Sequence, residues 1–123
     1  MEMERRLFAV RAATQLNRDN RGEIIEAVCD MYDRVCEANA LSVPDMVSIM
    51  FTMTSDLRSA NPATALRSRD ERFEVPLFCM QEPEVDNMLE RTIRLIIHYY
   101  APEHHSPKAI YLHGATKLRP DLS

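Results

Sequence analysis

The spacing of apolar and polar residues predicts a strand followed by a long helix in the first third of the chain. Residues 5–13 alternate loosely, with Leu7 and Ala9 on one side, as expected for a half-buried strand. From Arg21 to Asn39, apolar residues recur every three or four positions, which predicts a helix with one face toward the core. The residues expected on that face are Ile25, Val28, Cys29, Tyr32, Val35 and Cys36.

The remainder of the chain is predicted to contain four strands and one short helix. Residues 46–53 are nearly all apolar, so we expect a central strand covered on both faces. Asn61 and Pro62 suit the cap and first position of a helix that reaches about residue 69. Further strands are expected at residues 74–78, 91–100 and 109–113.

This order of elements predicts an α/β or α+β fold, and periodicity does not separate the two. The sheet is expected to be single and mixed, with helices mainly on one face. The 123 residues fit one domain spanning positions 1–123, since domains usually contain about 100–200 residues. The 46% hydrophobic composition supports a core, and a domain of this size leaves enough surface for self-association.

Charge and cysteine content narrow the class of partner. Fifteen basic against nineteen acidic residues give a formal charge of −4, which argues against nucleic acid as the main partner. No apolar run approaches the roughly 20 residues of a membrane span, and the first residues lack a secretory apolar segment. Cys29, Cys36 and Cys79 form no CxxC pair, so we expect reduced thiols in the cytoplasm.

Two arginines on predicted strands are the first candidate site residues. Arg94 interrupts an apolar strand, where a guanidinium is costly to desolvate unless an anion or acceptor meets it. Arg11, near the end of the first strand, is a second guanidinium that needs an anion or acceptor if it is buried. Two such guanidinium groups suit a small dicarboxylate, because each can bind one carboxylate through two oriented hydrogen bonds. Internal ion pairs are an equally good explanation from residue type alone.

The segment 76–82 places a thiol and a carboxylate three residues apart, directly after an apolar run. Cys79 could be a nucleophile, although no neighbour in sequence supplies its base, and a buried inert thiol is the better default. Glu82 could be a general base, a hydroxyl acceptor or a solvated surface carboxylate. The segment is therefore a candidate site with several open interpretations.

Several familiar chemistries lack their signatures in this chain. The histidines follow no zinc spacing, and the two glycines leave no room for a phosphate-binding GxGxxG or Walker loop. The GxSxG and HExxH motifs are also missing. Arginines, a carboxylate, a thiol and a tyrosine without an activated nucleophile suit a reaction catalysed by positioning and charge complementarity.

In order and spacing, several segments together resemble the AroH class of chorismate mutases. The matching segments are residues 10–14, 51–57, 61–63, 75–77, 80–82, 93–94, 110–112 and 118–122. This resemblance implies a trimeric, pseudo-barrel assembly of α/β subunits with active sites between neighbours. It implies an intramolecular Claisen rearrangement of chorismate to prephenate in phenylalanine and tyrosine biosynthesis, with no cofactor, metal or covalent intermediate.

The resemblance also implies roles for individual residues. Arg94 would face the ether oxygen whose bond breaks, with Glu82 and Arg11 as the other catalytic residues. Arg11 and Tyr111 would hold the enolpyruvyl carboxylate, and Cys79 and Glu82 the ring hydroxyl. Arg67 would serve the ring carboxylate, and the tail from Leu118 would cover the site. The implied substrate-binding set is Arg11, Asn61, Arg67, Phe78, Cys79, Met80, Gln81, Glu82, Arg94, Tyr111 and Leu118.

Three positions depart from the usual pattern of the family. Asn61 stands where Phe is common, Thr64 where a basic residue often follows Pro-Ala, and Phe78 where a small polar residue often precedes the cysteine. We therefore expect an active mutase with weaker substrate binding. The alternatives are a non-catalytic trimer that binds a small carboxylate in the same cleft and a plain protein-interaction module.

Overall fold

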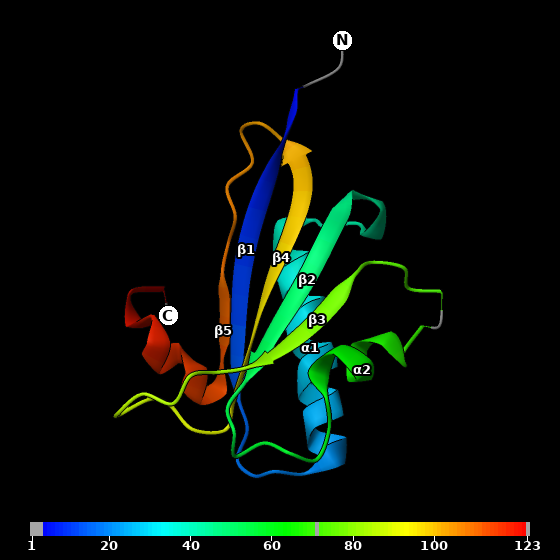
Figure 1. Cartoon of the computed structure of the whole chain (residues 1–123). Helices are drawn as coiled ribbons and strands as arrows, with labels where there is room; N and C mark the ends of the chain where they lie inside the picture. The colour runs from blue at the N-terminus through cyan, green and yellow to red at the C-terminus, as the bar shows by residue number, and fades with distance from the viewer. Residues whose placement is uncertain (1–3, 71, 123) are drawn as a thin grey trace.

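The computed structural model describes residues 4–70 and 72–122, which form a single mixed sheet with helices on one side (Figure 1). The strands are β1 (Arg5–Gln15), β2 (Met46–Met53), β3 (Leu77–Gln81), β4 (Thr92–Pro102) and β5 (Ile110–Leu112). The helices are α1 (Arg21–Asn39) and α2 (Pro62–Arg67), with 3-10 turns η1 (Val43–Asp45), η2 (His113–Leu118) and η3 (Pro120–Leu122). The predicted order of strands and helices is confirmed.

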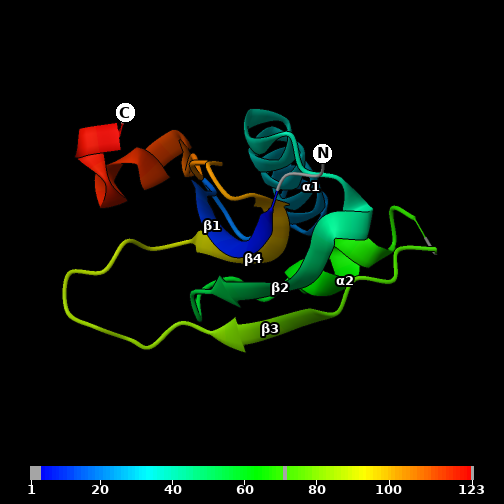
Figure 2. The same ribbon diagram turned by 90° about the horizontal axis from the view of Figure 1, so that it is seen from above.

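The strand order in the sheet is β3-β2-β4-β1-β5, which makes β4 the central strand. β4 pairs antiparallel with β1 and with β2, whereas β2–β3 and β1–β5 are parallel. Figure 2 shows α1 and α2 on one side of the sheet, with the β3–β4 loop and the C-terminal turns extending away from the helices. Of the described helices, none is both long and apolar enough to cross a membrane.

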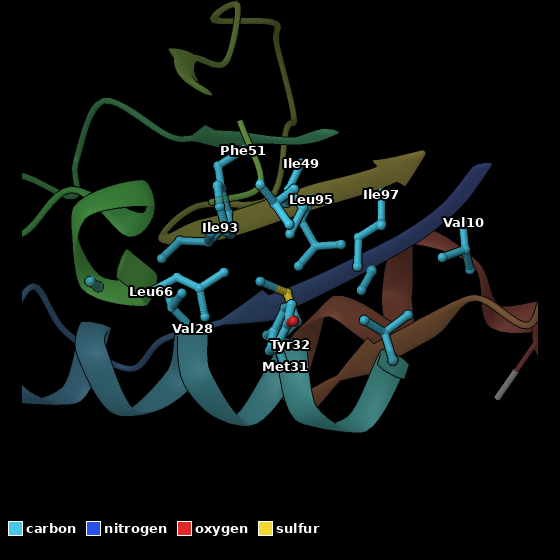
Figure 3. Close-up of a cluster of buried hydrophobic side chains, with 14 of the residues drawn as sticks. Val10, Val28, Met31, Tyr32, Ile49, Phe51, Leu66, Ile93, Leu95 and Ile97 are labelled. Atoms are coloured by element: carbon cyan, nitrogen blue, oxygen red, sulfur yellow. The ribbon is translucent and has the colours of Figure 1, made fainter. Parts of the chain in front are cut away.

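The core lies between α1 and the sheet (Figure 3). The prediction for the buried stripe of α1 was partly wrong, because Ile24 and Met31 are fully buried while Ile25, Cys29 and Cys36 are only half-buried. Both stripes satisfy spacings of three and four, so periodicity does not choose between adjacent lines on a helix. Side chains from the strands that close the core include Ile49, Phe51, Ile93, Leu95 and Ile97.

Asparagine caps begin both helices. The Asn20 Oδ1 accepts a hydrogen bond from the Glu23 backbone N–H at 3.0 Å, and Asn61 Oδ1 accepts from Ala63 and Thr64 at 2.9 and 3.2 Å. The expected cap of α2 is therefore confirmed. The helix ends at Arg67 rather than near residue 69. Directly after its last residue, the Ser68 hydroxyl donates a hydrogen bond to the Ala65 carbonyl. Such side-chain hydrogen bonds to backbone carbonyls compete with the backbone hydrogen bonds that would extend the helix.

The strand predicted at residues 74–78 lies instead at Leu77–Gln81, so that prediction was shifted by three residues. Pro76 has no N–H, and its carbonyl accepts from Ile49 at 3.0 Å at the start of the ladder with β2. The ladder continues to the Glu82 N–H, which donates to the Met53 carbonyl at 2.8 Å. Residues 79–81 therefore lie within a strand, and Glu82 lies directly after it.

β2 has the predicted bounds, 46–53, and the ends of β1, β4 and β5 differ from the prediction by at most two residues. β1 reaches Gln15 and β4 reaches Pro102, because the two strands pair along their full length, from Arg5 with Pro102 to Gln15 with Thr92. β5 is limited to three residues. The prediction that β2 is covered on both faces is wrong for the single chain, because both helices lie on one side and Met50 and Thr52 on the other side are only half-buried.

Candidate active site

The strand register places candidate residues in two rows on the sheet face opposite α1, which we call the open sheet face. Directly paired residues point to the same side of a sheet, and successive residues alternate between sides. One row crosses all five strands through Met80, Thr52, Arg94, Ala13 and Tyr111. The neighbouring row contains Phe78, Met50, Ile96 and Arg11.

Arg94 and Glu82, predicted from separate segments, meet on this face. Arg94 Nε lies 3.1 Å from Glu82 Oε1, and the Glu82 side chain is only 15% exposed against 46% for Arg94. Thr52 Oγ1 donates a hydrogen bond to the same Glu82 oxygen at 2.5 Å. Within residues 4–70 and 72–122, the terminal guanidinium nitrogens of Arg94 and the Oε2 atom of Glu82 form no hydrogen bond.

Arg11 lies diagonally across from Arg94 on the same face, because Arg11 pairs with Ile96 and Arg94 with Ala13. Diagonal cross-strand neighbours lie within reach of long side chains. In the described part of the chain the side chain of Arg11 forms neither an ion pair nor a hydrogen bond, and it is exposed. The two arginines against one carboxylate leave a net positive face, which suits an anion of small size.

Two other predicted site residues lie on the opposite side of the sheet. Asn61 caps α2 and Arg67 ends it, and α2 packs against α1, β2 and β3 on the helical side. Arg67 is exposed, and its guanidinium forms no hydrogen bond or ion pair among the described residues, although its carbonyl accepts from the Asp70 N–H at 3.2 Å. A single chain therefore does not bring Asn61 or Arg67 to the open sheet face.

Cys79 also points away from Glu82. It pairs with Phe51, so its side chain lies on the helical side and packs against the core. Gln81 alternates to the same side of the strand but is exposed. Burial raises the pKa of the Cys79 thiol above its ordinary value of 9.0. A protonated thiol on this side is a packing group.

Cys79 should consequently react slowly with iodoacetamide near neutral pH. The thiolate is the reactive form, and a raised pKa delays its appearance as pH rises. We expect alkylation of Cys79, followed by mass spectrometry of its peptide, to accelerate at higher pH than alkylation of a short cysteine peptide. Rapid alkylation of Cys79 at pH 7 in the folded protein would contradict this placement.

The C-terminal turns lie beside Tyr111. η2 packs against β1 and β5, and Leu118 at its end is half-buried. Arg119 forms a two-pronged ion pair with Asp121, at 3.1 and 2.9 Å. The hydrogen bond to Asp121 raises the pKa of Arg119, and Tyr111 adds a smaller effect. Tyr111 thus joins the open sheet face to the tail.

An apolar border flanks the charged cluster. Phe78 is 63% exposed and Met80 is 42% exposed, and both lie on the outward side of β3. Exposed large apolar side chains that continue across neighbouring strands indicate a surface that contacts another molecule.

The histidines do not gather into a metal site in the described residues, where no group of three or more potential metal-binding side chains occurs. His98 lies 3.3 Å from the Ser48 hydroxyl, and His105 lies 2.7 Å from the Tyr99 hydroxyl. These two imidazoles are hydrogen-bond partners within the fold.

Thr52 is the site residue that sequence reasoning missed. It was noted only as part of a matching segment, although it is one of two hydroxyl residues, with Ser48, in a mostly apolar strand. The signal was its parity with Met50 on β2, which assigns it to the open face. Its pairing with Arg94 depends on the β2–β4 register, which the sequence does not supply.

Comparison with known proteins agrees with the predicted family and the fold. The family model for chorismate mutase type I matches residues 7–122. Chorismate mutase AroH of Bacillus subtilis (strain 168) is 32% identical over 116 residues, covering 93% of this chain and 91% of the relative. Chorismate mutase AroH of Thermus thermophilus is 32% identical over 115 residues, covering 92% and 93%.

The solved structure of a chorismate mutase from Clostridium thermocellum is similar to this chain with a TM-score of 0.83 and 33% identity. The match covers 89% of this chain and 98% of that one. The expected family and fold are therefore confirmed, and this chain belongs to the chorismate mutase type I family.

Proposed function

We propose that the chain, as a chorismate mutase, rearranges chorismate to prephenate in aromatic amino acid biosynthesis, with the open sheet face as one wall of its active site. Family membership supports the activity. The observation that carries the mechanism is the position of Arg94, which Glu82 anchors through Nε while its terminal nitrogens are free.

The rearrangement breaks a carbon–oxygen bond and forms a carbon–carbon bond within one molecule. Negative charge develops on the ether oxygen, and Arg94 is the cation available to meet it. One preorganised donor at such an atom typically lowers a barrier by about 3 kcal/mol. Arg11 would hold one substrate carboxylate and the free oxygen of Glu82 would accept the ring hydroxyl, so that the compact reactive conformer is bound.

No step in this mechanism requires a nucleophile. Cys79 faces the core and its raised pKa keeps the thiol protonated. The resemblance implied that Cys79 contacts the ring hydroxyl, and we propose that backbone groups of residues 78–82 make this contact instead. Phe78 and Met80 would border the substrate on its apolar side.

We propose that the assembly is a homotrimer in which the open sheet face is covered by neighbouring copies. The apolar part of this face includes Leu7, Met50, Phe78, Met80, Ile96 and Tyr100. A sheet face of this kind requires a second layer, and the described chain supplies helices to the other face only. Arg67 and Asn61, which lie away from Arg94, would reach the active site of an adjacent subunit.

The three cysteines are unpaired thiols, which supports a reducing compartment, and we propose the cytoplasm.

The proposed activity is tested by following the ultraviolet absorbance of chorismate with the purified chain. We expect turnover, and we expect Glu82→Gln to lower kcat/KM by roughly 10- to 100-fold, because a hydrogen bond to a charged group is lost and Arg94 loses its anchor. The matched control is Glu37→Gln on the exposed surface of α1, which should behave as wild type.

The other outcomes separate the competing functions. Thermal stabilisation by chorismate or prephenate without turnover would overturn the mutase assignment in favour of a carboxylate-binding protein. The lack of both turnover and stabilisation would favour an interaction module.

A further inference from the structure

The Glu82 carboxylate is held at one oxygen only. Thr52 Oγ1 donates to Oε1 at 2.5 Å, and Arg94 Nε approaches the same atom at 3.1 Å. In the described part of the chain Oε2 accepts no hydrogen bond, although the side chain is only 15% exposed. One oxygen is thus occupied by two donors, and the other is left to accept a hydrogen bond from outside the chain.

The two donors come from rigid, adjacent positions. Thr52 and Arg94 are direct register partners on β2 and β4, and Glu82 follows the last residue of β3. The Glu82 N–H continues the ladder to Met53 at 2.8 Å, so its backbone is fixed as well. Threonine is stiff at χ1 because it is β-branched, so its hydroxyl defines a point in space.

Without Thr52, the carboxylate and guanidinium would be free to meet in the two-pronged arrangement that arginine prefers. That arrangement would consume Oε2 and a terminal nitrogen of Arg94, which are the atoms that the substrate needs. The Thr52 hydroxyl opposes this by holding Oε1 toward β2.

We propose that Thr52 is a positioning residue that holds Glu82 so that Oε2 faces the substrate hydroxyl and the terminal nitrogens of Arg94 face the ether oxygen. This rests on the proposed mutase function and adds a third polar residue to its machinery. Thr52 does not touch the reacting atoms, and acts through Glu82 and Arg94.

The test compares the isosteric Thr52→Val, which lacks the hydroxyl, with Thr52→Ser, which retains it. Loss of a hydrogen bond to a carboxylate should lower kcat/KM of Thr52→Val by about 10- to 100-fold. Thr52→Ser should restore activity to within about threefold of wild type, because its hydroxyl reaches the same oxygen. Solution mass and melting temperature should be unchanged in both variants.

A double-mutant cycle with Glu82→Ala separates positioning from packing. A residue that acts through Glu82 loses its effect once the carboxylate is gone, so Thr52→Val should cost less than about twofold in the Glu82→Ala background. A packing residue would cost the same in both backgrounds. If valine disturbs assembly, Thr52→Ala against Thr52→Ser provides the same comparison.

Three results would overturn the proposal for Thr52: near-wild-type turnover of Thr52→Val, an equal loss in Thr52→Ser, or an undiminished loss in the Glu82→Ala background. Each of these presupposes an active wild-type protein, so it leaves the proposed function intact. An inactive wild-type protein would instead overturn the proposed function, and the role of Thr52 with it.

Discussion

Arg94→Ala is expected to lower kcat of the mutase by about 100- to 1000-fold, the usual cost of removing one preorganised donor from a developing negative charge. KM should change much less, because the interaction is strongest in the transition state. Steady-state measurement of chorismate consumption gives both constants. Arg94→Lys should recover part of the loss, since it restores charge without the planar fork.

The control for Arg94 is Arg34→Ala on the exposed side of α1, where the side chain pairs only with Asp30. This change removes one positive charge from the protein but leaves the open sheet face untouched, so turnover should match wild type. If Arg94→Ala retained wild-type kcat while remaining folded, the electrostatic mechanism would be wrong.

Met50→Lys is expected to break the assembly and with it the activity. Met50 pairs with Phe78 and with Ile96 in the apolar part of the open sheet face. In the proposed trimer a neighbouring copy would bury a charge at this position. An unpaired buried charge costs several kcal/mol, and Arg94 and Arg11 on the same face carry the same sign. Light scattering should report a fall from the trimer mass toward the 14.2 kDa of one chain.

The matched variant for assembly is Val43→Asp in η1, an exposed apolar residue outside the open sheet face. It should retain both mass and activity. A wild-type protein that is monomeric at working concentration, or a Met50→Lys variant of unchanged mass and turnover, would contradict the shared-site model.

The parts of the fold that were predicted correctly depend on residues close together in the sequence. The asparagine caps and Pro62 defined the start of α2, and the 3.6-residue period defined α1 from Arg21 to Asn39. The position of β3 was not predictable in the same way, because the parallel pairing with β2, rather than local propensity, decides that the strand continues to Gln81. The buried line of α1 depended on packing against the sheet for the same reason.

For the site, residue type and resemblance predicted Arg11, Glu82 and Arg94, and the register brings all three to the open sheet face. Residue type alone favoured a buried, inert Cys79, and the thiol does pack against the core. The sequence could not show which face of the sheet it occupies, because a one-residue shift in pairing register reverses every side chain. Thr52 was missed for a related reason: its partner is 42 positions away and is supplied only by the strand order. The catalytic and binding roles of these residues are still predictions.

The strand order has a consequence for how the site responds to a ligand. β4 has hydrogen-bonded neighbours on both sides, whereas β3 is an edge strand paired only with β2. Arg94 thus stands on a strand that is paired on both sides, and we expect its position to be set during folding rather than during each turnover. Glu82 ends the edge strand but is still held by its hydrogen bond to Met53, so we expect adjustments during substrate entry to fall on the loop that follows it.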